Sequence, residues 1–285
     1  MSVLFSNFSW YELWGPLYLV FCGLLSYWYF KRVVFFHRLT ITTTHINCFM
    51  SAVVLLYLIK GSPLAVIAKH YLFSAHILQL SVLFFAIIPL FILGLPTSFL
   101  RQYFWHYRTR LFMGMLAYPW VNVFLFNGIV TVYLLPPVFN TIQESVLLTL
   151  ISQVVLMLVA FLMWWVIISP IPEVSHIPYL SRIVYIFFAS ILLMPIGIFL
   201  LIIQKEHYHV YAAVAGDLIP FMTAIYDQQL AGGILKVVQL TSYVFALLKI
   251  VLTWGKEEDE KEGQVDDENV RVVQGVVIYL QQGKR

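Results

Sequence analysis

The sequence predicts an all-α protein, a polytopic membrane helix bundle with seven transmembrane helices, its N-terminus outside and its C-terminus in the cytoplasm. Of the 285 residues, 61% are hydrophobic and only 11% are charged, whereas about 25% are charged in a soluble domain. Seven apolar segments approach the length of about 20 residues that a helix needs to cross a bilayer. Tryptophans stand near several segment ends, as is typical of membrane interfaces.

Hydropathy places the seven spans at residues 13–31, 42–60, 70–95, 113–135, 146–169, 183–204 and 230–253. Three prolines inside these limits predict kinks, because proline removes a backbone hydrogen bond. They are Pro89, Pro119 and Pro195.

Two domains follow from this pattern: a seven-helix transmembrane domain at residues 1–255 and a charged cytoplasmic tail at 256–285. Eight of the fourteen acidic residues lie between positions 257 and 268. Such a charge run is expected to be solvated and mobile. The valine-rich residues 270–280 are expected to form a short strand or helix.

The distribution of Lys and Arg predicts the orientation, since cytoplasmic loops are enriched in these residues. The loops after spans one, three and five, together with the tail, carry twelve of them, and the loops on the other side carry three. The twelve are Lys31, Arg32, Arg38, Arg101, Arg108, Arg110, Arg182, Lys256, Lys261, Arg271, Lys284 and Arg285, and the three are Lys60, Lys69 and Lys205. The N-terminus is therefore expected outside the plasma membrane.

Polar side chains gather at the predicted outer ends of spans three, five and seven. They are His70, His76 and Gln79 in span three, Gln153 in span five, and Asp227, Gln228 and Gln229 before span seven. An unpaired polar group in hydrocarbon costs several kcal/mol. We therefore expect one shared pocket that satisfies these groups together. The alternative is that each side chain bonds separately to nearby backbone, without a common cavity.

A metal site is one interpretation of this cluster. Imidazole suits copper, zinc, iron and nickel, and thioether suits copper(I). His70 and His76 would point about 120° apart on one helix, so a metal would need ligands from other segments. His207, His209 and Met222 lie on the same predicted side of the membrane.

Asp227 has a second, structural interpretation. It precedes the predicted seventh helix, where a carboxylate accepts backbone N–H bonds as an N-cap and favours the helix dipole. The glycines that follow, Gly232 and Gly233, would let this helix approach a neighbour closely.

Other classes of function lack support. The chain has no GxSxG, HExxH or P-loop motif and no pair of intramembrane aspartates, so it is not expected to be an enzyme. No basic patch is large enough for nucleic acid. Cys22 and Cys48 lie in apolar runs outside any CxxC motif, which indicates buried packing residues. Membrane lipid is an expected partner.

Two ordered stretches carry a resemblance. The first has KGSPL at residues 60–64, FSAHILQ at 73–79, then Pro89 and GLP at 94–96; the second is DQQLAG at 227–232. These stretches, with MWW at 163–165, resemble the CtaG membrane family of cytochrome c oxidase (caa-type) assembly factors. The resemblance covers residues 10–255 and leaves the tail outside.

The resemblance implies a protein of the bacterial plasma membrane that helps to build heme–copper oxidase, with oxidase subunits as partners. The implied role is support of copper insertion from the extracytoplasmic side. The residues that match the family are His76, Gln79, Asp227, Gln228 and Gln229. Many members have histidines where this chain has Leu80, Leu134 and Gln153, which leaves fewer imidazoles for copper. A transporter, of copper or another substrate, and a metal-independent scaffold for oxidase subunits are the alternatives.

The predicted orientation can be tested with reporter fusions. Alkaline phosphatase fused after residue 285 should be inactive, because it would remain in the cytoplasm, whereas green fluorescent protein at that position should fluoresce. An active C-terminal phosphatase fusion would contradict the orientation.

Overall fold

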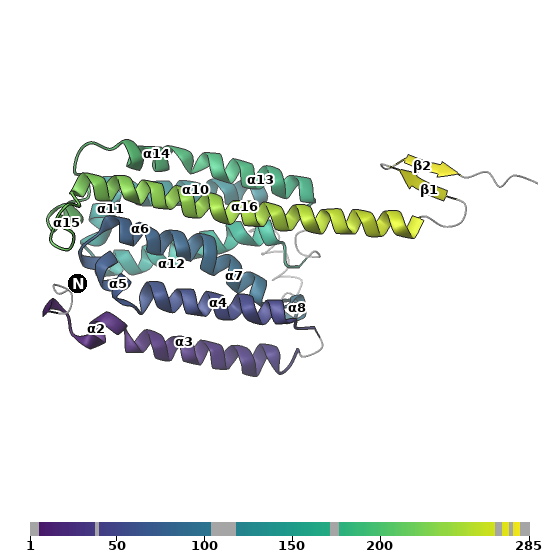
Figure 1. Cartoon of the computed structure of the whole chain (residues 1–285), viewed down its shortest axis with the longest axis horizontal. Helices are drawn as coiled ribbons and strands as arrows, with labels where there is room; N and C mark the ends of the chain where they lie inside the picture. Colours follow the sequence, from purple (N-terminus) through teal and green to yellow (C-terminus); the bar gives the residue numbers. More distant parts are fainter. Residues whose placement is uncertain are drawn as a thin grey trace, which may run out of the picture.

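The structure, a computed structural model, describes residues 6–37, 40–103, 118–171, 177–265, 270–273 and 276–279. Its helices lie side by side in a bundle, with short helices at one end (Figure 1). Parts of two predictions fall outside the described residues: the first residues of span four, 113–117, and several cations of the orientation argument. Those cations are Arg38, Arg108, Arg110, Lys284 and Arg285.

The elements follow the predicted order. They are α2 (Trp10–Trp14), α3 (Pro16–Tyr29), η1 (Phe30–Val34), α4 (Thr43–Lys60), α5 (Pro63–His70), α6 (Phe73–Val82), η2 (Leu83–Ile87), α7 (Ile88–Gly94), α8 (Thr97–Tyr103), α10 (Pro119–Leu134), α11 (Pro136–Gln143), α12 (Val146–Ile168), α13 (Tyr179–Leu192), α14 (Met194–Ile202), α15 (His209–Ala212), α16 (Ala224–Val265), β1 (Val270–Val273) and β2 (Val276–Tyr279).

Within the described ranges, six helices or continuous helical stretches are long and apolar enough to cross a membrane. The pair α10 and α11, which is bent by 74°, makes a seventh if it counts as one span. The first described residues and the far end of α16 lie at opposite ends of the bundle (Figure 1).

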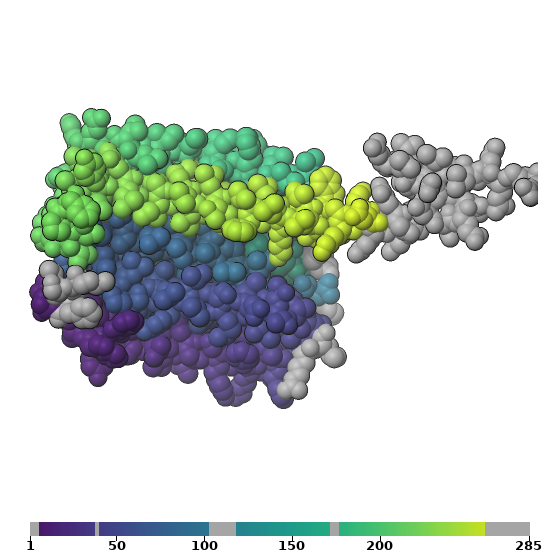
Figure 2. Space-filling model, viewed as in Figure 1, coloured from purple at the N-terminus to yellow at the C-terminus, as the bar shows by residue number. Residues whose placement is uncertain are grey.

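The last helix, α16, runs for 42 residues and projects beyond the body of the bundle (Figures 1 and 2). It therefore crosses the predicted boundary between residues 255 and 256 without a break, and the acidic run is helical as far as Val265. Beyond it, β1 and β2 pair as an antiparallel hairpin. This hairpin is the strand alternative expected for the valine-rich segment.

Pro89 changes the geometry of the third span. Before it lies a π-helical turn, in which the N–H of Ile88 bonds to the carbonyl of Leu83, five residues back. An α-helix would instead direct the N–H of Ile88 to Phe84 and that of residue 89 to Phe85, but proline has no N–H. The carbonyls of Phe84 and Phe85 therefore lose their α-helical donors.

Side chains from two other helices bond to these carbonyls. Trp164 Nε1 of α12 donates to the carbonyl of Phe84 at 2.7 Å. The Ser242 hydroxyl of α16 donates to the carbonyl of Phe85. Freed backbone groups in a membrane helix need such partners, so the proline joins spans three, five and seven at this depth.

The other two prolines take different places. Pro119 is the first residue of α10, where its missing N–H has no helical partner anyway. Residues 104–117 lie outside the described part of the chain, so the kink in span four stays a prediction. Pro195 lies in the first turn of α14, just after the single residue that separates α14 from α13. Span six is therefore interrupted where the kink was predicted.

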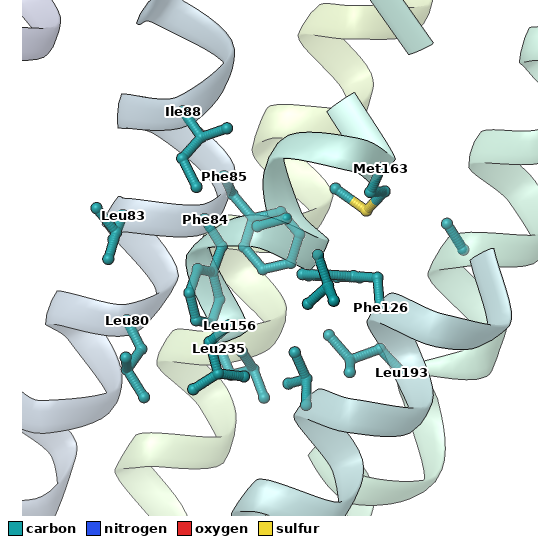
Figure 3. Close-up of a cluster of buried hydrophobic side chains, with 14 of the residues drawn as sticks. Leu80, Leu83, Phe84, Phe85, Ile88, Phe126, Leu156, Met163, Leu193 and Leu235 are labelled. Carbon is teal, nitrogen blue, oxygen red and sulfur yellow. The ribbon is translucent and has the colours of Figure 1, made fainter. Parts of the chain in front are cut away.

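The core of the bundle is built around the same region of span three. Phe84 and Phe85 face Phe126 of α10 and Met163 of α12 (Figure 3). The rings of Phe84 and Phe126 meet edge to face with their centroids 6.0 Å apart. Because lipid tails are as apolar as these side chains, close packing rather than removal from water stabilises such a core.

Gly232 confirms the predicted close approach of the last helix to a neighbour. A Cβ atom at this position would lie 2.8 Å from Leu200 Cβ and 2.9 Å from Leu201 N, both in α14. At Gly233 the nearest contact would be an ordinary 3.8 Å to Leu201 Cδ2. The two neighbouring glycines therefore differ: only Gly232 is required for the packing of α14 on α16.

We expect Gly232→Ala to destabilise the protein by about 1–3 kcal/mol, because backbone atoms of α14 would have to move. Gly233→Ala is the matched control, and it should be neutral or stabilising by about 0.5–1 kcal/mol, since alanine favours the helix. Thermal unfolding of both variants in detergent measures the difference. Equal melting temperatures would contradict the packing argument.

Candidate functional site at the start of α6

Asp227 of α16 lies directly at the N-terminus of α6. Its carboxylate accepts hydrogen bonds from the backbone N–H of Phe73 at 2.6 Å and of Ser74 at 3.1 Å. The hydroxyl of Ser74 donates to the same carboxylate. The first N–H groups of a helix have no partner within the helix, and a carboxylate there also complements the helix dipole. Asp227 therefore caps α6 from another span.

The prediction that Asp227 caps its own helix is thus wrong in one respect. The α16 helix begins at Ala224, four residues earlier than a cap at Asp227 requires, so the backbone of Asp227 is already helical and its side chain is free to point sideways. The carboxylate accepts backbone N–H bonds at a helix start, as predicted. The helix is α6 instead of α16, and the capped residue Ser74 is 153 positions away in the chain.

The two glutamines after Asp227 hold the connection between α14 and α16. Gln228 accepts from the backbone N–H of His207 at 3.2 Å and donates to the carbonyl of Ala224 at 2.8 Å. Gln229 donates to the carbonyl of Ile203, just after α14, at 2.9 Å. Each amide therefore satisfies backbone groups where a helix starts or ends.

Gln79 likewise bonds to a backbone group near the end of a helix, in this case α4. Its Nε2 atom donates to the carbonyl of Ile59 at 2.5 Å, and its Oε1 atom lies 3.4 Å from Lys60 Nζ. The last carbonyls of a helix lack helical donors, so Gln79 ties α6 to the end of α4. Together with Asp227, it fixes both neighbours of α6 at this end of the bundle.

His76 faces the interior of the bundle and not the lipid. Its Nε2 atom lies 3.0 Å from the hydroxyl of Tyr133 in α10. The imidazole meets the ring of Phe139 in α11 edge to face at 5.4 Å, and Tyr211 in α15 lies at 6.3 Å. The His76 side chain remains partly exposed. The structure thus brings this histidine and Asp227 to the same end of α6.

The aromatic residues around His76 were not identified from the sequence. Tyr208 stacks on Phe73 at 3.9 Å and donates to the carbonyl of Leu134 at 2.6 Å. Tyr211 donates to the carbonyl of Ala68 at 2.8 Å. Burial raises the pKa of Tyr208 and of Tyr211, so both hydroxyls stay protonated as donors. The sequence signal that could have identified Tyr208 and Tyr211 was their position in a loop just after an apolar segment.

His70 lies outside this arrangement. It is the last residue of α5, exposed, and separated from α6 by a turn, so the expectation that it shares a helix with His76 is wrong. Ser62 and Pro63 start α5 as a separate short helix: the Ser62 hydroxyl accepts from the backbone N–H of Leu64. The His70 ring lies 5.3 Å from that of Phe8. Partial desolvation on this side of the ring, together with the charge of Lys69, lowers the pKa of His70.

Gln153 is also outside the network. It lies partly exposed on α12, and its side chain makes no hydrogen bond within the part of the chain that the structure describes. Trp164 of span five instead donates to the carbonyl of Phe84 in span three, and its ring lies 6.0 Å from that of Tyr243 in span seven. The predicted single pocket is therefore replaced by the stated alternative, in which most of these polar side chains bond separately to backbone.

The described residues also contain no group of three or more His, Cys, Asp or Glu side chains placed to hold a metal ion. Of the suggested additional ligands, His207 is engaged through its backbone, which bonds to Gln228 and Asn140, and His209 is exposed.

The family described as cytochrome c oxidase caa3 assembly factor (Caa3_CtaG) matches residues 27–257. The chain belongs to this family. The matched range includes every residue of the α6 site, and no curated protein and no solved structure matches the chain. Membership in Caa3_CtaG indicates an assembly factor for cytochrome c oxidase with a non-catalytic role, and the apolar helices fit a multi-pass membrane protein.

Replacing the capping carboxylate should destabilise the bundle. Asp227→Ala leaves two backbone N–H groups and the Ser74 hydroxyl without their acceptor, and we expect a loss on the order of 3 kcal/mol in the free energy of unfolding. Asp217→Ala, at an exposed loop position, should change it by about 0.5 kcal/mol or less.

A double-mutant cycle with Ser74→Ala isolates the pair. The two single losses should sum to more than the loss of the double variant, because both changes remove the same hydrogen bond. Strictly additive losses would show that the cap contributes nothing through Ser74.

Proposed function

We propose that this CtaG-family protein assists cytochrome c oxidase assembly as a metal-independent scaffold for oxidase subunits in the bacterial plasma membrane. In this proposal the chain crosses seven times, with its N-terminus outside and its C-terminus in the cytoplasm. The observation that supports a scaffold is that the family-motif amides and carboxylate are bonded to backbone of neighbouring helices. Their role is to fix the shape of this end of the bundle.

The geometry explains why rigidity would matter. Asp227 joins α16 to α6, and Gln79 joins α6 to α4. The aromatic side chains from α10, α11 and α15 then pack against α6 on the side of His76. A fixed extracytoplasmic surface of this kind loses little conformational entropy on binding a subunit, which favours the complex.

Copper insertion is the second candidate, and one observation favours it. His76 is partly exposed, and its Nδ1 atom makes no hydrogen bond to the described residues. Copper held as cargo needs several soft or imidazole donors. The carboxylate of Asp227 already accepts three hydrogen bonds, so His76 would have to act with ligands from a partner subunit. A copper transporter would have the same shortage of donors.

The amount of oxidase and its copper content distinguish these functions. In a strain that lacks this protein, a scaffold predicts less assembled oxidase, with an unchanged ratio of copper to heme in the oxidase that remains. Copper added to the medium should not restore the amount. When the His76→Gln variant is expressed in this strain, the oxidase that assembles should again have an unchanged ratio of copper to heme. This should hold whatever amount of oxidase the variant restores.

The opposite result would overturn the scaffold proposal. Copper insertion predicts oxidase subunits that accumulate at their normal level with less copper per heme and that recover activity in excess copper. A transporter predicts copper uptake by the purified protein in liposomes, and it predicts loss of that uptake on changing His76.

A further inference from the structure

A lateral cavity lies at the other end of the third span, away from the α6 site. It has a volume of about 720 Å³, which is within the range of 300–1,000 Å³ for small-molecule sites. Its wall is mostly apolar and comes from η2, α7, α12, α13 and α16. The residues that matter for the argument are Ala86, Pro89, Ala246, Lys249, Arg182 and Tyr179.

The cavity exists because the third span bends away from α16. The last helix packs along α6 and η2 but makes few contacts with α7, which packs on α4 and α12 instead. Figure 1 shows α7 and α16 diverging after α6. The divergence begins at the π-helical turn before Pro89, so the same proline that frees two carbonyls also opens this space.

Two cationic side chains stand at one end of the cavity. Arg182 comes from α13 and Lys249 from α16. One carboxylate lies nearby: Glu257 accepts a hydrogen bond from the Tyr179 hydroxyl and faces the Arg182 guanidinium. The Lys249 ammonium makes no hydrogen bond to the described residues. Its neighbours on α4 are His45 and Cys48, neither of which carries a carboxylate. Among the described residues, this corner therefore carries one positive charge without a paired carboxylate.

The depth of these charges is also informative. Lys249 lies seven residues before the charged run that starts at Lys256, about 10 Å along a helix at 1.5 Å per residue. The distribution of Lys and Arg predicts this end of the bundle to be cytoplasmic. Basic side chains at such an end attract anionic lipid head groups, at about 1 kcal/mol per charge.

We propose that this cavity binds one anionic phospholipid, with an acyl chain along the apolar wall and its phosphate between Lys249 and Arg182. The single negative charge of a phosphodiester balances the single excess positive charge of the corner. A neutral, zwitterionic lipid would bring an extra cation toward Arg182 and bind less tightly. This inference does not depend on the proposed scaffold function, because it concerns a different end of the bundle.

Native mass spectrometry of the purified full-length protein tests the proposal, with phosphatidylglycerol and phosphatidylcholine as the added lipids. We expect one phosphatidylglycerol to bind more tightly than phosphatidylcholine. Lys249→Gln should weaken phosphatidylglycerol roughly fivefold, the equivalent of about 1 kcal/mol. Lys205→Gln removes the same charge at an exposed position outside the cavity and should have no effect.

A second variant tests the space instead of the charge. Ala246→Phe places a ring inside the cavity and should reduce binding of phosphatidylglycerol, whereas Val154→Phe, on an exposed face of α12, should not. Equal binding of the two lipids, or equal binding by Lys249→Gln and Lys205→Gln, would overturn the proposal. So would undiminished binding by a folded Ala246→Phe variant.

Discussion

The carboxylate of Asp227 at the first turn of α6 is the contact on which this end of the bundle depends. It accepts two backbone N–H groups and a hydroxyl from the third span while belonging to the last one. In a membrane, these donors would otherwise remain unpaired at several kcal/mol each. A single acidic side chain therefore sets how the last helix lies against the third, and the arrangement of α14 and α15 follows from the glutamines beside it.

The same solution recurs through the bundle. Backbone groups that a helix cannot satisfy, at its ends or beside a proline, receive a side chain from another span. Gln79 serves the end of α4, and Trp164 and Ser242 serve the carbonyls beside Pro89. Because the donors and acceptors come from distant parts of the chain, each local irregularity fixes a tertiary contact. Gly232 adds the close approach that lets α14 follow α16.

These contacts give the two ends of the bundle different characters. At the α6 end, the motif side chains and the tyrosines are committed to internal hydrogen bonds around His76. At the other end, the bend at Pro89 leaves an apolar cavity with a cationic corner at Lys249. An assembly factor of the Caa3_CtaG family thus combines a rigid polar end with a cavity that opens where two spans separate.

The amino-acid sequence by itself determined the helical membrane class, the approximate positions of most apolar helices and the family, because hydropathy and the two motifs are local properties. It also indicated that His76, Gln79 and Asp227 lie at one end of the bundle. Only the tertiary structure decided which groups they bond to. Asp227 caps α6 rather than α16, and His70 belongs to a separate short helix. The reason is physical: the partners are backbone atoms of other spans, and neither their direction nor their distance is encoded in residue type or spacing.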